Sequence, residues 1–201
     1  VKTLCLGTSG SEEDFFTMKE TLENFASYNN IKFTYKRGNV PYLHPGRTAQ
    51  VYCDGTLIGT FGQLRYDVVD SMAIAKDKKN DTKIFIAELN YDVLKTKFKE
   101  EITYTPESTF AKTGRDIAMI VDKEVECGDI IATIEKADPL VAEVDLFDIF
   151  ESEKLGFGKK SMAFRIVFAS NEADVTDEMT DKAVDSIVNT LKDVYGALMR
   201  S

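Results

Sequence analysis

Hydrophobic side chains in the first half of the chain follow the spacing of a helix in one segment and the spacing of strands elsewhere. Large apolar residues recur three or four positions apart from Phe15 to Phe25, which predicts an amphipathic helix. Ser11 precedes three acidic residues and is the expected N-cap of this helix. The pair Asp54-Gly55 is typical of a hairpin turn. The expected strands are residues 1–6, 31–35, 50–62 (as a hairpin) and 82–89, with short helices at 68–75 and after Asn90.

The second half of the chain has a simpler order of elements. Its strand, helix, strand, strand, helix, strand pattern is the ferredoxin-like arrangement, with both helices on one face of an antiparallel sheet. A polar stretch containing Pro106 is the best boundary, so we expect an α+β protein with domains at 1–103 and 104–201. The expected strands are residues 116–121, 140–150, 161–170 and 197–200, and the expected helices are 129–137 and 176–196.

One face of this ferredoxin-like sheet carries no helix, and strand alternation predicts which side chains lie on it. In the third strand, large apolar residues occupy every second position from Met162 to Phe168 and must face the helices. The same reasoning turns Phe147 and Ile149 of the second strand inward, together with alternate residues of the first strand from Ile117 onward. The residues left facing outward are Asp116, Ala118, Asp148, Phe150, Ser161, Ala163 and Arg165.

The charge of the chain argues against a free-standing nucleic-acid binder. Residues 1–103 carry 14 basic and 14 acidic side chains, whereas residues 104–201 carry 11 and 20, which accounts for the whole net charge of −9. An acidic unit repels a phosphate backbone. An aromatic ring on a polar sheet face can stack unpaired bases, although such a ring is more often a dimer contact or has no special role. A ferredoxin-like regulatory or oligomerisation module that binds a small ligand is therefore the alternative to RNA binding.

The cysteine and histidine content excludes several classes of site. Cys5, Cys53 and Cys127 lack any zinc-ligand spacing, so we predict reduced thiols in or near the core and no metal site. His44 is the only histidine, which excludes pairs and triads built on histidine. No segment approaches the roughly 18 apolar residues of a membrane span. Because the chain starts at Val1 without a methionine, we expect a fragment of a longer protein.

Eight strings stand in order along the chain: 13–19 (EDFFTMK), 43–49 (LHPGRTA), 55–62 (GTLIGTFG), 115–118 (RDIA), 146–150 (LFDIF), 160–165 (KSMAFR), 176–178 (TDE) and 196–200 (GALMR). In this order and register they resemble the β subunit of bacterial phenylalanyl-tRNA synthetase. Residues 62–66 read GQLRY where this family more often has GELHP, which is a local departure. The resemblance implies that residues 1–103 are the C-terminal part of a class II synthetase-like domain that has lost catalysis. It implies that residues 104–201 are a ferredoxin-fold anticodon-binding domain.

The resemblance also implies an RNA site on the open sheet face. By resemblance, Phe150 stacks on the first anticodon base in place of the usual tyrosine, Asp148 accepts hydrogen bonds from a guanine edge, and Arg200 reaches a phosphate or a base edge. The positions that match the family's anticodon contacts are Ala118, Asp148, Phe150, Ser161 and Arg200. The cations expected to support them are Arg115, Lys159, Lys160 and Arg165.

The enzyme implied by the resemblance attaches phenylalanine to tRNA(Phe) with ATP and Mg²⁺. Its chemistry lies in the α subunit of a cytoplasmic α2β2 heterotetramer. We therefore expect this chain to be non-catalytic and to hold no cofactor or metal itself. Its expected partners are the tRNA(Phe) anticodon loop and the α subunit, with no DNA and no membrane.

Overall fold

In a computed structural model, the described residues are 1–72, 83–98 and 110–200. The chain divides into two compact units, Val1–Tyr104 and Thr105–Ser201. Each unit has its own antiparallel sheet and its own apolar core, so the protein is α+β as predicted. The expected domain boundary at residues 103 and 104 lies outside the described residues.

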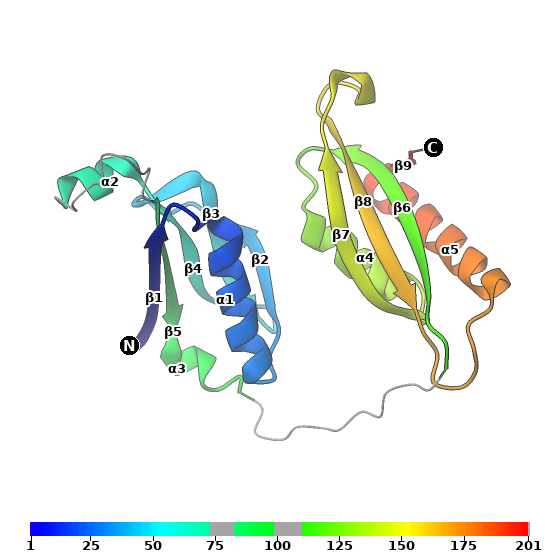
Figure 1. Cartoon of the computed structure of the whole chain (residues 1–201), viewed down its shortest axis with the longest axis horizontal. Coiled ribbons are helices and arrows are strands. Elements are labelled where there is room, and N and C mark those ends of the chain that lie inside the picture. Colours follow the sequence, from blue (N-terminus) through cyan, green and yellow to red (C-terminus); the bar gives the residue numbers. More distant parts are fainter. Residues whose placement is uncertain (73–82, 99–109, 201) are drawn as a thin grey trace. The chain divides into compact units, whose positions relative to one another are not determined.

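The first unit is a five-stranded sheet with helix α1 packed on one face (Figure 1). The strand order is β1-β5-β4-β3-β2, and each neighbouring pair is antiparallel. Met18, Leu22 and Ala26 of α1 are buried against the strands, as the helical spacing predicts. The elements are β1 (Thr3–Gly10), α1 (Phe15–Tyr28), β2 (Phe33–Arg37), β3 (Leu43–Cys53), β4 (Thr56–Leu64), α2 (Tyr66–Ser71), β5 (Lys83–Asn90) and α3 (Tyr91–Leu94).

The N-cap of α1 is Asp14, and the prediction of Ser11 was wrong. An Asp14 carboxylate oxygen accepts hydrogen bonds from the backbone N–H groups of Phe16 and Thr17 at 2.7 and 2.8 Å. The Thr17 hydroxyl accepts in turn from the Asp14 N–H at 3.0 Å, which completes a capping box. A carboxylate at this position also interacts favourably with the positive end of the helix dipole, which a serine hydroxyl cannot do.

The loop residues of the first unit have structural roles. Asp54 and Gly55 both have positive φ, 46° and 72°, which is the backbone of the predicted two-residue hairpin turn. Strand β3 begins earlier than expected, but its ladder with β4 is irregular around His44. There the His44 Nδ1 accepts a hydrogen bond from the Gly46 N–H at 3.1 Å. Asn90 caps α3 as predicted, by accepting from the Val93 N–H at 3.2 Å.

The second unit has the predicted βαββαβ order, with both long helices on the same face of a four-stranded antiparallel sheet (Figure 1). The strand order is β7-β8-β6-β9. Thr176 caps α5, and Gly196 ends it in the left-handed region at φ 61°, as predicted. The elements are β6 (Thr113–Asp122), α4 (Cys127–Ala137), β7 (Val141–Phe150), the 3-10 helix η1 (Glu153–Leu155), β8 (Lys159–Phe168), α5 (Asp177–Tyr195) and β9 (Leu198–Met199).

Strand alternation correctly identifies the helix-facing side of β6 and β8. The apolar residues on this side of the two strands form one cluster with Ile130 and Ile134 of α4 and with Ile187 and Leu191 of α5. Burying such a layer of apolar side chains supplies the main favourable free energy of the unit, and it leaves the opposite face of the sheet open. The buried strand residues are Ile117, Met119, Val121, Met162, Phe164, Ile166 and Phe168.

Candidate nucleic-acid interface

The open face of the second sheet is organised in rows that run across the strands. The register places Asp148 of β7, Ala163 of β8 and Ala118 of β6 side by side in one row. Arg200 closes this row, since its backbone N–H donates to the Ala118 carbonyl at 2.8 Å. The row therefore offers a carboxylate at one end, a guanidinium at the other and two methyl groups between them.

The neighbouring row contains the aromatic ring. Phe150 lies opposite Ser161 on β8, which lies opposite Ile120 on β6. Phe150 is 42% exposed, whereas Ser161 is only 2% exposed, so neighbouring atoms cover almost all of the serine. Alternation predicts the outward orientation of both residues. It does not predict the burial of Ser161.

Arg200 bridges the two rows. Its guanidinium carbon lies 5.0 Å from the centroid of the Phe150 ring, a cation–π geometry. The two residues come from opposite ends of the strand order. Two small residues, Ala118 and Ala163, pair with each other on the strands between them. The structure thus brings together all five residues expected to contact the anticodon.

Phe147 lies on the open face, and the prediction that it points toward the helices was wrong. The β7–β8 ladder shifts register between Leu146 and Asp148, so Phe147 is the extra residue of a β-bulge. Its ring is 56% exposed, and the guanidinium carbon of Arg165 lies 5.7 Å from the ring centroid. After the bulge, the residues of β7 alternate as predicted, so Asp148 and Phe150 face outward.

Ile149 pairs with Met162 and so has the predicted inward orientation. It is nevertheless 51% exposed, because it lies near the end of β7 where the core cluster no longer covers it. Inward orientation and burial are therefore separate properties at this strand end.

The supporting cations do not gather into one positive cluster. Arg115 pairs with Ile166, so it lies on the helix side, where it donates to Asp177 of α5 at 2.7 Å. This hydrogen bond raises the pKa of Arg115. Lys160 also lies on the helix side, and its ammonium group donates to the Val125 carbonyl at 2.7 Å. Neither residue supports the open face, which alternation could have shown for both.

Lys159 and Arg165 lie on the open face but are paired with carboxylates. Lys159 forms an ion pair with Asp122 at 2.7 Å. Arg165 forms a two-pronged pair with Asp116, with N–O distances of 2.9 and 2.8 Å. Hydrogen bonding from Arg165 lowers the pKa of Asp116, and the same bond raises the pKa of Arg165. Among the described residues, no such ion pair is found for Arg200, which leaves it as the uncompensated cation of this face.

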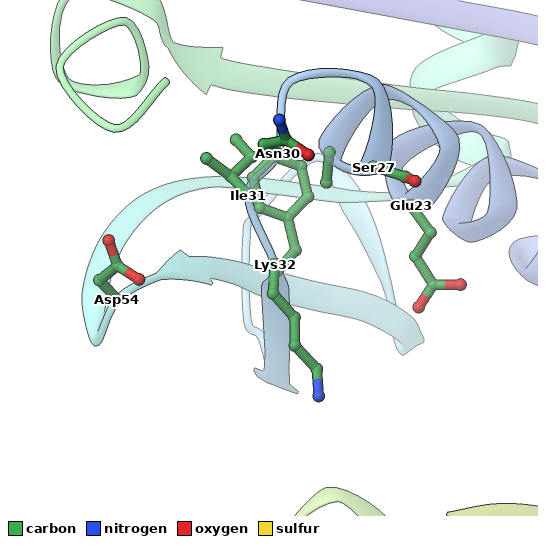
Figure 2. A pocket seen from close by; sticks show the side chains of 8 residues that line it. Glu23, Ser27, Asn30, Ile31, Lys32 and Asp54 are labelled. Carbon is green, nitrogen blue, oxygen red and sulfur yellow. The ribbon is translucent and has the colours of Figure 1, made fainter. Parts of the chain in front are cut away.

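Two other features carry no ligand chemistry. In the first unit, a hollow of about 540 Å³ lies beside the end of α1 (Figure 2). Figure 2 shows Asp54 on the opposite side of Lys32 from Glu23, with the three charged groups ending apart from one another, so they do not form a shared binding point. Within the described parts of the chain, no cluster of His, Cys, Asp and Glu has the geometry to hold a metal ion.

The cysteines and the helices bear on two further expectations from the sequence. Cys5 is exposed, against the expectation of thiols in or near the core, Cys53 is buried and Cys127 is partly buried; none of the three forms a disulfide. Across the described residues, no helix has both the length and the apolar character to cross a bilayer.

Comparison with known families matches each unit separately. Residues 108–200 match the sequence model of the Ferredoxin-fold anticodon binding domain. Residues 2–91 match that of the Phenylalanyl tRNA synthetase beta chain CLM domain. The two matched segments follow one another along the chain and together cover most of it.

Three relatives that match nearly the whole chain carry the same name. The phenylalanine–tRNA ligase beta subunit of Clostridium tetani is 37% identical over 201 residues, which cover 98% of this chain and 24% of the relative. The beta subunit of Carboxydothermus hydrogenoformans is 35% identical over 192 residues, covering 94% of this chain and 23% of the relative. That of Staphylococcus epidermidis is 34% identical over 188 residues, covering 93% and 22%. The chain thus spans about a quarter of the length of these relatives.

Proposed function

The chain belongs to the family of phenylalanyl-tRNA synthetase β subunits, and we propose from this premise that its second unit binds the anticodon loop of tRNA(Phe) on the open sheet face. The observation that carries the proposal is the convergence of Ala118, Asp148, Phe150, Ser161 and Arg200 on two adjacent rows. These side chains provide a ring for stacking, a carboxylate and a hydroxyl for base edges, and a guanidinium.

Recognition of this kind suits an acidic unit. Unpaired bases bind by stacking and by hydrogen bonds to their edges, neither of which needs a positive surface. The Asp148 carboxylate can accept hydrogen bonds from the N–H groups of a guanine edge. The Ser161 hydroxyl can donate or accept one only where a base reaches below the exposed surface, because the serine is 2% exposed. The small side chains of Ala118 and Ala163 leave room for a base to lie flat beside Phe150.

Arg200 and an incoming base compete for the same face of the Phe150 ring. The guanidinium carbon of Arg200 lies 5.0 Å from the centroid of this ring. A base that stacks on this ring face displaces the guanidinium, which is then free to bind a phosphate of the same loop. The ring therefore stays partly covered until a base replaces the arginine.

A dimer through the open face is the less favourable alternative. The face carries the carboxylates of Asp116 and Asp148, and Asp145 lies opposite Arg165 in the ladder. A second copy of the face would bring like charges together, which destabilises such a contact. Sedimentation of the chain at high concentration separates the two proposals, since anticodon binding needs no self-association.

The activity of the whole enzyme is part of the same proposal. We infer that this chain acts within a cytoplasmic ligase that attaches phenylalanine to tRNA(Phe), with an α subunit as its partner in an α2β2 assembly. ATP supplies the activation of the amino acid in such an enzyme, and Mg²⁺ supports it. We assign the steps of ATP chemistry to the α subunit of such an enzyme.

The direct test is titration of the complete synthetase with an anticodon stem–loop of tRNA(Phe). We expect saturable binding that is lost when the first anticodon base is removed. Binding that does not depend on any base of the loop would contradict the proposal. The matched control is a stem–loop with the same stem and the anticodon of a different tRNA.

A further inference from the structure

A second aromatic platform lies on the open face beyond the two rows already described. It consists of the Phe147 ring and the guanidinium of Arg165, whose central carbon lies 5.7 Å from the ring centroid. The Phe147 ring is 56% exposed, and the Arg165 side chain is 59% exposed. Aromatic rings and arginine planes are the two kinds of side-chain surface on which unpaired bases stack.

A β-bulge keeps this platform on the same face as the first subsite. Leu146 pairs with Phe164 on the helix side, so alternation places Phe147 on the open face, and the bulge keeps Asp148 on that face as well. The Phe147 ring therefore stays more than half exposed, where it adds little to the apolar core. Bulges are over-represented beside functional sites, where they redirect a side chain. A single exposed ring is common on protein surfaces, so the state of Arg165 beside it is the deciding observation.

Arg165 is oriented as a flat surface, and its charge is compensated. Both prongs of its guanidinium donate to the Asp116 carboxylate, at 2.9 and 2.8 Å, which fixes the plane of the group. Asp145 lies opposite Arg165 on the other neighbouring strand and adds further negative charge. A phosphate would have to compete with both carboxylates. A neutral base would not, because it binds through its π-face.

We propose that Phe147 and Arg165 form a second stacking subsite, which holds another unpaired base of the same RNA loop whose first base binds at Phe150. This inference rests on the proposed anticodon-binding function. Arg165 and Ser161, which mark the two subsites on β8, are four residues apart, or about 13 Å along an extended strand. Stacked nucleotides of one strand are only about 3.4 Å apart. The loop must therefore lie across the face with its bases unstacked from one another.

The test measures the dissociation constant of the complete synthetase for anticodon stem–loops in which each loop position in turn lacks its base. Phe147→Leu keeps an apolar side chain but removes the ring, and we expect it to weaken binding of the intact loop roughly tenfold. The same variant should bind the loop that lacks one particular base as well as the wild type does. That position should differ from the one whose removal cancels the effect of Phe150→Ala.

Two further variants make the test specific. Arg165→Lys keeps the charge but loses the plane, so it should weaken binding at the same loop position as Phe147→Leu, with the salt dependence of binding unchanged. Phe157→Leu removes a fully exposed ring from the β7–β8 connection and should leave the affinity unchanged. The melting temperature of each variant checks that the fold is intact.

The outcomes separate the two proposals. If Phe147→Leu binds every loop as the wild type does while Phe150→Ala still depends on one base, the second subsite is wrong and anticodon binding stands. If neither variant depends on any loop base, anticodon binding itself is wrong. If Arg165→Met, which removes the charge, reduces the salt dependence, Arg165 binds a phosphate, which contradicts the stacking role.

Discussion

The guanidinium of Arg200 lies 5.0 Å from the centroid of the Phe150 ring, although β7 and β9 are the two outermost strands of the sheet. The contact crosses the two intervening strands, β8 and β6, on which Ala163 and Ala118 pair with each other. It covers the aromatic surface on which we propose that a base stacks. The first two predictions separate the contributions of these two residues.

Loss of the Phe150 ring should weaken tRNA binding without affecting amino-acid activation. Base–aromatic stacking contributes about 1–3 kcal/mol, so Phe150→Ala in the complete enzyme should raise the KM for tRNA(Phe) by about 5- to 150-fold. ATP–pyrophosphate exchange, which reports adenylate formation, should stay near the wild-type rate. Phe150→Tyr keeps the stacking face and is the matched control. An equal loss in the exchange reaction would contradict the assigned role.

Arg200 should be responsible for part of the salt dependence of binding. It is a cation of the open face without an ion-pair partner among the described residues, whereas Arg165 is paired with Asp116. For single-stranded RNA each phosphate contact contributes about 0.7 to the slope of log K against log salt. Arg200→Met should reduce this slope by about that amount, and Arg165→Met should leave it unchanged. Equal slopes for Arg200→Met and the wild type would exclude a phosphate contact.

The Arg165–Asp116 pair should make stability depend on pH in the acid range. Hydrogen bonds from Arg165 hold the pKa of Asp116 below its ordinary value. The pair therefore stabilises the folded state above the unfolded pKa of about 3.9, and this contribution is lost as the pH falls through the lowered folded value. Because the pair is exposed, the effect should be small. Melting temperatures of the wild type and Asp116→Asn should differ near neutral pH and converge in strong acid. A constant difference would indicate a packing effect.

Replacing Tyr35 with phenylalanine should stabilise the folded protein. Its hydroxyl is buried and has no hydrogen-bond partner among the described residues, and burial raises its pKa above the ordinary value. A buried, unsatisfied polar group costs about 1–3 kcal/mol. Tyr35→Phe should therefore increase the free energy of unfolding by about 1 kcal/mol in a denaturant titration. Tyr52→Phe is the control, because the Tyr52 hydroxyl donates to Gln50 at 3.0 Å, and its removal should not stabilise.

Two glycine-to-alanine changes should act in opposite directions. A Cβ atom at Gly59 would lie 2.0 Å from the Glu88 carbonyl oxygen, so the paired strands β4 and β5 would have to separate. Gly59→Ala should cost at least about 1–3 kcal/mol of unfolding free energy. At Gly128, in the first turn of α4, a Cβ atom would meet nothing within 4 Å. Gly128→Ala should be neutral or stabilising by up to about 1 kcal/mol. A stable Gly59→Ala variant would contradict the close approach of these strands.

The order of elements and the helix-facing side of β6 and β8 follow from short-range rules. Apolar residues at every second position from Met162 to Phe168 can be buried only on one face of a strand, and all four are buried. Thr176 and Gly196 mark the ends of α5 because capping depends on local hydrogen bonds and backbone angles. Ser11 failed as the cap of α1 for the same local reason, since Asp14 lies nearer the helix and also accepts from two backbone N–H groups.

The sequence by itself determined the family, the ferredoxin-like order of the second unit and which positions of β6 and β8 face outward, because these depend on spacing along one chain segment. The tertiary structure alone decided the position of Phe147, since a bulge depends on how two strands align. It also decided the partners of Arg115 and Arg165, and the reach of Arg200 to Phe150. Each of these joins side chains from segments far apart in sequence, and periodicity within one segment carries no information about such pairs.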